Sequence, residues 1–356
     1  MPPSAGSARS RAHRAVGPSG ELDVLVGEVR TTLLQNSHQA STDMVARLLD
    51  LDPASRVRTA TRPFAHAVSP EARTGVHCPL ATGSGISADG VGTVLARASI
   101  TGGVVLQASA RARLVRAAAE RRQPWAHHMA NPGVIEVVGR SGEDDLAAGF
   151  LQKARQASAT GQGPSPLDLG SVGSRLLDRV QRMPYIDRVP MLRARRTRLR
   201  FAVTWPAPDP SRPEPAGLDI EFIVHDETAR TLRLRLPPSM RDPDAVLVAC
   251  EDLALHDWLL STVAVLVENS RIGADPAAQV VARVRPAIDH LLHLWMPGAK
   301  VAENLAEVWA ALERRPGFSN QWSSLRGQIQ NQLLLAILEK PEAGPARAAA
   351  AFRERN

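Results

Sequence analysis

The spacing of apolar residues along the first 140 positions predicts strands. Residues 22–34 are rich in β-branched side chains, which favour strands. Two further runs, 91–100 and 104–115, flank Thr101-Gly102-Gly103, a sequence typical of a hairpin turn. In the second run apolar and polar residues alternate, which is the period of a half-buried strand. With one more short strand at 134–138, we expect residues 21–140 to form a mainly β domain.

Two shorter segments interrupt this pattern. Ser41 or Thr42 can cap a helix that runs to Leu51. The extended stretch 56–68 contains Pro63, which cannot donate to a sheet ladder, so we expect an edge strand or an irregular one.

The middle of the chain predicts a helical connector followed by a second sheet. Residues 143–157 and 167–183 have helical periodicity, and the Gly/Pro-rich residues 161–166 between them indicate a linker within the connector 141–190. Three strand-like runs follow at 195–205, 218–225 and 231–236. We expect them to form a small antiparallel three-stranded sheet at 191–240, which could also pair with the first sheet.

After Pro237-Pro238 the pattern is helical almost throughout. Four segments, 245–269, 276–294, 298–314 and 320–339, predict a bundle of about four helices in a domain at 241–340. The basic residues 1–20 are expected to be a disordered tail, and the Ala- and Arg-rich residues 341–356 a flexible one. The predicted fold class is therefore α+β.

Composition narrows the class of protein. The chain has 356 residues, of which 44% are hydrophobic and 22% charged, as is normal for a globular protein. The longest apolar run, 258–267, is too short to span a membrane, and residues 1–20 lack the apolar core of a signal peptide. Two distant cysteines, Cys78 and Cys250, do not make a disulfide framework. These features predict a cytoplasmic protein without a membrane span.

Positive charge is concentrated before residue 241. Residues 1–240 contain 31 basic and 22 acidic side chains, against 12 and 14 in residues 241–356. In the strand predicted at 195–205, Arg196, Arg198 and Arg200 share one face, opposite an apolar face that points to the core. Acidic residues in the next predicted strand favour a salt-bridged solvent face, although excess arginine could also bind an anionic partner.

Residues 121–128 gather Arg, Trp and His in a segment expected to be a loop. Loops on a rigid sheet often carry function, and Arg and Trp are enriched in binding hot spots. The alternative is that Trp125 fills the core while both histidines are exposed. The candidate binding residues of the chain are Arg121, Arg122, Trp125, His127, His128, Arg196, Arg198 and Arg200.

Motifs for catalysis or cofactor binding are not evident. His290 and His293 share a helical segment with the spacing i, i+3, but neither an HExxH pattern nor a carboxylate-rich loop completes a metal site with His256. The chain has no GxxxxGK[ST] and no GxSxG motif. We therefore expect no metal and no cofactor, and the balance is against an enzyme.

Several longer strings occur together in this chain. They are GEVRTTLLQNS (27–37), SPEARTGVHCPL (69–80), RRQPWAHHMANPGVIEVVG (121–139), CEDLALHDWLLSTV (250–263), HLWMPGAKV (293–301) and PGFSNQW (316–322). With them the chain resembles a family of conserved actinobacterial proteins of uncharacterised activity, over most of its length. The resemblance implies a gene cluster shared with a variant P-loop protein, and thus a protein partner.

The sequence predicts a non-enzymatic interaction or regulatory component of a multi-protein cytoplasmic system, with a P-loop NTPase as a candidate partner. One alternative is a nucleic-acid-binding protein that uses the basic N-terminal two thirds. Another is an enzyme with an unrecognised site around residues 122–128.

Overall fold

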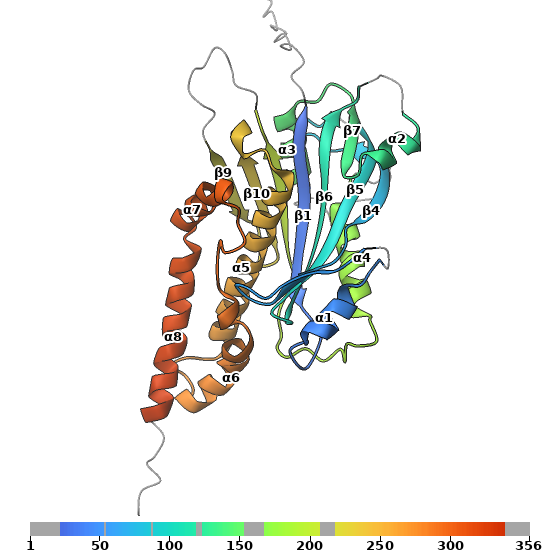
Figure 1. Ribbon diagram of the computed structural model, residues 1–356. Helices are drawn as coiled ribbons and strands as arrows, with labels where there is room; N and C mark the ends of the chain where they lie inside the picture. The colour runs from blue at the N-terminus through green and yellow to red at the C-terminus, as the bar shows by residue number, and fades with distance from the viewer. Residues whose placement is uncertain are drawn as a thin grey trace, which may run out of the picture.

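Strands from both halves of the sequence combine into one ten-stranded sheet (Figure 1). The computed structural model describes residues 22–52, 55–86, 88–118, 123–152, 167–206 and 218–338. The tails expected at 1–20 and 341–356 and the linker expected at 161–166 lie outside these ranges.

The strands are β1 (Asp23–Leu33), β2 (Arg58–Ala60), β3 (His66–Val68), β4 (Ala72–Leu80), β5 (Ala88–Thr101), β6 (Val105–Arg116), β7 (Val134–Val138), β8 (Thr197–Thr204), β9 (Asp219–Val224) and β10 (Ala229–Arg235). The helices are α1 (Thr42–Leu49), α2 (Trp125–Ala130), α3 (Glu143–Gln152), α4 (Leu169–Gln181), α5 (Pro243–Asn269), α6 (Ala277–His290), α7 (Ala306–Arg314) and α8 (Phe318–Leu338). Short 3-10 turns cover Pro238–Met240, Leu292–Leu294 and Glu303–Leu305.

The prediction of a separate three-stranded sheet is wrong. The order of strands is β2-β3-β5-β7-β6-β1-β8-β10-β9, with β4 also paired to β5, so β1 joins the two predicted sheets through antiparallel ladders with β6 and β8. Moreover β10 lies between β8 and β9 and runs parallel to β8. The alternative that the second sheet pairs with the first is confirmed.

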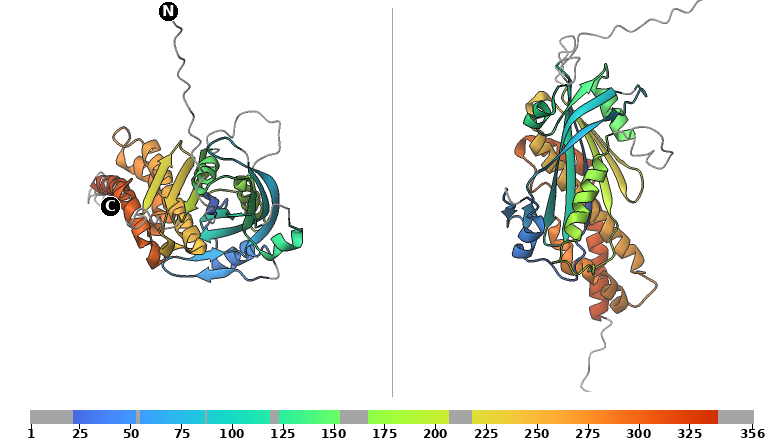
Figure 2. Two further views of the ribbon diagram at one scale, coloured as in Figure 1. Left: turned by 90° about the horizontal axis from the view of Figure 1, so that it is seen from above. Right: turned by 90° about the vertical axis from the view of Figure 1, so that its right-hand side faces the viewer.

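Helices cover both faces of the central strands (Figure 2), whereas the edge strands β2, β4 and β9 are largely exposed. Alternate residues of β1 divide between two cores: Val29 packs beneath α5, whereas Val26 packs in the core that includes residues of α1, α3 and α4. A strand buried on both faces has apolar residues at nearly every position, which explains the VLVGEV sequence of β1.

The C-terminal helices form a layer over the α5 face of the sheet (Figure 1). Asp242 caps α5, its side chain accepting hydrogen bonds from the amides of Asp244 and Ala245. Within the described residues, no helix has the length and apolar character needed to cross a membrane.

Candidate functional site

The segment around Trp125 is a short helix, where the sequence predicted a loop. Trp125 is 43% exposed and His128 only 3%, so the histidine, rather than the tryptophan, is the buried side chain. The two rings make an edge contact, with centroids 5.7 Å apart, and the Trp125 ring lies over Gly75 of β4. His127 is exposed beside His128, and Arg121 and Arg122 lie outside the described residues.

The arginine-rich strand β8 has the predicted alternation but not the predicted solvent face. Arg200 is buried, and its Nε donates to Glu28 Oε2 at 2.8 Å while its Nη1 donates to the carbonyl of Phe150 in α3. Arg196 pairs with Asp178 of α4 at 3.3 Å. Because α3 and α4 cover this face, Arg196 and Arg200 hold the layers together, and Arg198 also has an interacting partner.

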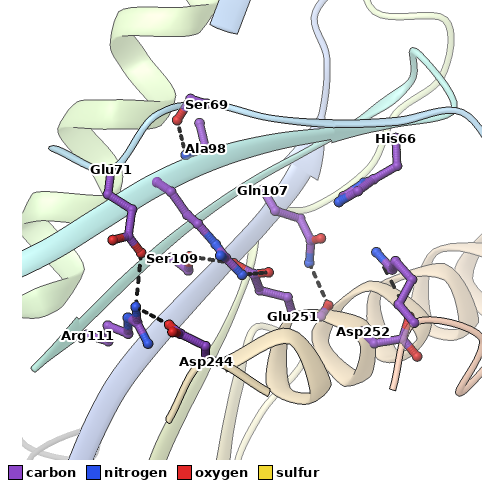
Figure 3. A network of polar contacts seen from close by, with 12 residues as sticks. His66, Ser69, Glu71, Ala98, Gln107, Ser109, Arg111, Asp244, Glu251 and Asp252 are labelled. Carbon is purple, nitrogen blue, oxygen red and sulfur yellow. Dashed lines mark hydrogen bonds and ion pairs between the residues drawn. The ribbon is translucent and has the colours of Figure 1, made fainter. Parts of the chain in front are cut away.

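A buried polar network joins α5 to the sheet (Figure 3). Arg97 of β5 donates two hydrogen bonds to the Glu251 carboxylate of α5, at 2.9 and 2.6 Å. Ser109 of β6 donates to the same carboxylate at 2.6 Å, and Gln107 donates to the Glu251 carbonyl at 3.0 Å. Burial alone would raise the pKa of Glu251, but the Arg97 guanidinium and the hydrogen bonds from Arg97 and Ser109 hold that pKa below its usual value.

The network continues toward solvent on one side. Arg111 contacts Glu71 at 3.0 Å and Asp244 at 2.5 Å (Figure 3). These two acids, together with Arg97 and Lys300, line an open polar pocket of about 400 Å³. Three basic and three acidic side chains line the pocket, so it has no excess of one charge that would select an anion or a cation.

Lys300 and two histidines complete the network within the protein. Burial lowers the pKa of Lys300, whose Nζ lies 4.0 Å from Asp252 and over the Phe64 ring. Burial, with Lys300 nearby, lowers the pKa of His66 to about 3. Burial also lowers the pKa of His256, whose ring accepts from the Met296 amide through Nε2. His256 is thus a core residue, and it does not join a metal-ligand cluster with His290 and His293 among the described residues.

The tryptophans of the helical layer are internal. Trp295 and Trp322 stack with centroids 4.2 Å apart, and Trp258 is fully buried. Trp309 is only partly buried and packs against the same core. These four tryptophans therefore stabilise the helical layer, and they do not form an exposed surface.

A large groove of about 1030 Å³ lies between the β9–β10 turn, residues 192–197, α5 and α6. Its apolar wall includes Val224, Val265 and Leu266. Three of the four arginines on its wall are each paired with a carboxylate: Arg195 with Glu227, Arg230 with Asp257, and Arg283 with Asp275. These pairs neutralise much of the positive charge that would attract nucleic acid.

Among the described residues, the end of α8 has four exposed aliphatic side chains close together in sequence. Leu334, Leu335, Ile337 and Leu338 are 59, 45, 66 and 80% exposed, and we call these four residues the α8 apolar tip. At 3.6 residues per turn they cover about 160° of the helix circumference. In Figure 1 they belong to the lower end of α8, beside α6.

The start of α8 is fixed in the core. Phe318, Trp322 and Ile329 are buried on one stripe of the helix, and the Glu313 carboxylate accepts hydrogen bonds from the Ser319 amide and hydroxyl at 3.1 and 3.0 Å. Arg326 is the only charged residue in the whole of α8. A firmly seated helix therefore presents an apolar, nearly uncharged end to solvent.

Neither the α8 apolar tip nor Glu251 was predicted from the sequence. The sequence does contain a pattern that could have predicted the tip. Residues 333–338, LLLAIL, place apolar side chains on every side of the helix, and a single neighbouring layer of the protein cannot bury all of them. Glu251 lies in a helix interpreted as apolar, and its partner Arg97 is 154 positions away.

Comparisons with protein-family models, curated proteins and solved structures found no match to this chain.

Proposed function

We propose that this protein is a non-enzymatic interaction component of a multi-protein cytoplasmic assembly, and that it docks on its partner through the α8 apolar tip. The exposure of four large aliphatic side chains within five residues carries the proposal. Contiguous exposed apolar patches on folded proteins mark interaction sites more often than single exposed residues do.

The energetics favour a covered tip. Fully burying one Leu or Ile side chain is worth about 1.5–3 kcal/mol. Four such residues, already partly buried, would contribute on the order of 5 kcal/mol before the cost of association is subtracted. That gain is enough to anchor a complex if the partner adds contacts around the tip.

The composition of α8 defines the chemistry of the partner. Leu334, Ile337 and Leu338 have the i, i+3, i+4 spacing with which a helix inserts into an apolar groove, and Leu335 widens this face. With Arg326 as its only charge, α8 gives a charged surface little to bind, so the partner should present an apolar cleft. The family resemblance makes the variant P-loop protein of the shared gene cluster the first partner to test.

The test compares wild type with Leu334→Gln/Leu338→Gln and with the control Ser324→Ala/Gln328→Ala, which changes exposed polar positions of the same helix. Binding to the purified P-loop protein is measured by calorimetry. We expect at least tenfold weaker binding for the tip variant, unchanged binding for the control, and the same circular dichroism for all three proteins.

Three outcomes would overturn the proposal. One is equal binding, or no binding, by wild type and tip variant. Another is a wild-type dimer in light scattering that the tip substitutions dissociate, which would make a second copy the occupant. The third is recovery of nucleic acid with affinity that falls steeply with salt, which would favour the alternative function.

A further inference from the structure

The hairpin-like connection between α2 and β7 brings His127, His128 and Glu136 together. The first two residues follow one another in α2, and Glu136 lies in the middle of β7. Asn131 closes the intervening turn, since its Nδ2 donates to the His127 carbonyl at 3.0 Å and its own carbonyl accepts from Thr93 at 3.3 Å. The three side chains are therefore positioned by a helix, a tight turn and a strand of the central sheet.

The donor atoms of these side chains converge. One ring nitrogen of each histidine and one carboxylate oxygen of Glu136 lie within 4.8 Å of one another, and His127 Nε2 is 2.7 Å from Glu136 Oε1. The two imidazole centroids are 5.4 Å apart, with the rings at 82°. Two imidazoles bound to one tetrahedral zinc ion have centroids about 5 Å apart and donor atoms about 3.3 Å apart.

His128 supplies a second and independent observation. Its side chain is buried, yet Nε2 has no hydrogen-bond partner among the described residues. Buried polar atoms in folded proteins are nearly always satisfied, so this nitrogen calls for a ligand. Trp125 packs against the same ring and helps to keep it in place.

We propose that His127, His128 and Glu136 form a zinc site. Two imidazole nitrogens and a carboxylate oxygen are ligands that Zn²⁺ prefers, and three protein ligands leave a fourth position for water or an external ligand. The position is accessible because the side chain of His127 is 42% exposed. A simple His127–Glu136 hydrogen bond would explain neither the unsatisfied nitrogen of His128 nor the arrangement of its ring. This site goes beyond the docking function and does not depend on it.

The experiment titrates Zn²⁺ into the full-length protein after chelator dialysis, using calorimetry and, with Co²⁺, visible absorption. We expect one ion per chain and a d–d spectrum of low-coordinate cobalt. His127→Ala should weaken Zn²⁺ binding at least 100-fold, and Glu136→Gln, which keeps the side-chain shape, at least tenfold. The exposed His293 provides the control His293→Ala, which should bind zinc as wild type does.

His128→Ala should also abolish stoichiometric zinc binding. Because His128 is buried, this variant could misfold, and the test then depends on His127→Ala, which changes an exposed side chain. The proposal is overturned if wild type binds no stoichiometric zinc. It is equally overturned if His127→Ala and Glu136→Gln bind as tightly as wild type, or if only His293→Ala loses the ion.

Discussion

Replacing Glu251 by Gln should cost much of the stability of the protein. The substitution keeps the shape of the side chain and its ability to accept a hydrogen bond from Ser109, but removes the charge that balances Arg97. Both side chains are buried between α5 and the sheet, at 7 and 6% exposure, and only the edge of Arg97 reaches the polar pocket, so water can replace little of the missing interaction.

The size of the effect follows from this geometry. Removing one partner of a buried ion pair leaves an uncompensated charge and costs about 3–5 kcal/mol. Because Gln retains a hydrogen bond, we expect the lower end, near 3 kcal/mol, against the 5–15 kcal/mol of a typical folded protein. The pKa of Glu251 is lower in the folded than in the unfolded state, so the ion pair stabilises above about pH 4.3 and this contribution is lost as pH falls further.

The assay is urea unfolding at pH 7 and at pH 4 or below, followed by tryptophan fluorescence. The control Asp289→Asn breaks the exposed Arg285–Asp289 pair on α6 and should cost less than about 1 kcal/mol. The double variant Arg97→Met/Glu251→Leu should recover most of the loss, because neither partner of this pair is then left as an unpaired buried charge. A Glu251→Gln protein as stable as the Asp289→Asn control at pH 7 would refute the reasoning.

Three further predictions concern single positions. The pKa of His66 falls to about 3 on folding, so the unfolded chain binds more protons between pH 6.5 and 3, and His66 should lower stability on acidification by up to about 1.4 kcal/mol per pH unit. In His66→Gln the urea midpoint should fall less than in wild type between pH 6.5 and 4.5, above the range in which Glu251 titrates; an equal fall would contradict this. Arg200→Gln should cost about 3 kcal/mol in the same urea assay, because Glu28 is left buried with fewer partners; a neutral result would mean that Arg200 belongs to an open surface. In Gly27→Ala the new Cβ would lie 2.1 Å from the Phe201 ring, so we expect a loss of at least about 1–3 kcal/mol in thermal unfolding, and an unchanged midpoint would contradict the packing of these strands.

Local patterns predicted many elements of this protein, although not the strand β4 or the helix α2. The alternation in residues 104–115 and the Thr101-Gly102-Gly103 turn predicted the β5–β6 hairpin, where both glycines have positive φ angles of 60° and 63°. The Ser41 cap was also predicted correctly, and all four C-terminal segments contain helix, although the helix expected at 298–314 begins only at Ala306, after a 3-10 turn at Glu303–Leu305. These features depend on neighbours a few positions apart, which the sequence displays directly.

The same local patterns could not predict which strands pair across long distances in the sequence, or which elements cover each face of the sheet. Alternation correctly placed Arg200 opposite the apolar face of β8, but it contains no information on whether solvent or α3 covers that face. The pairing of β8 with β1, with Val29 opposite Leu199, joins residues 170 positions apart, and any strand with two apolar faces could have been the partner.

The candidate sites also combine residues that local sequence predicts with residues that only the tertiary structure brings together. His127 and His128 were singled out by composition, whereas Glu136 joins them only because α2 is a helix that turns back onto β7. The α8 apolar tip depends on which residues the other helices leave uncovered, which follows from the tertiary structure alone.

The most direct test of the proposed function compares the affinities of wild type and of Leu334→Gln/Leu338→Gln for the P-loop protein proposed as the partner, measured side by side. The account predicts a stable complex with wild type that the tip substitutions weaken at least tenfold without altering the fold. Equal affinity for the two proteins would contradict docking through α8.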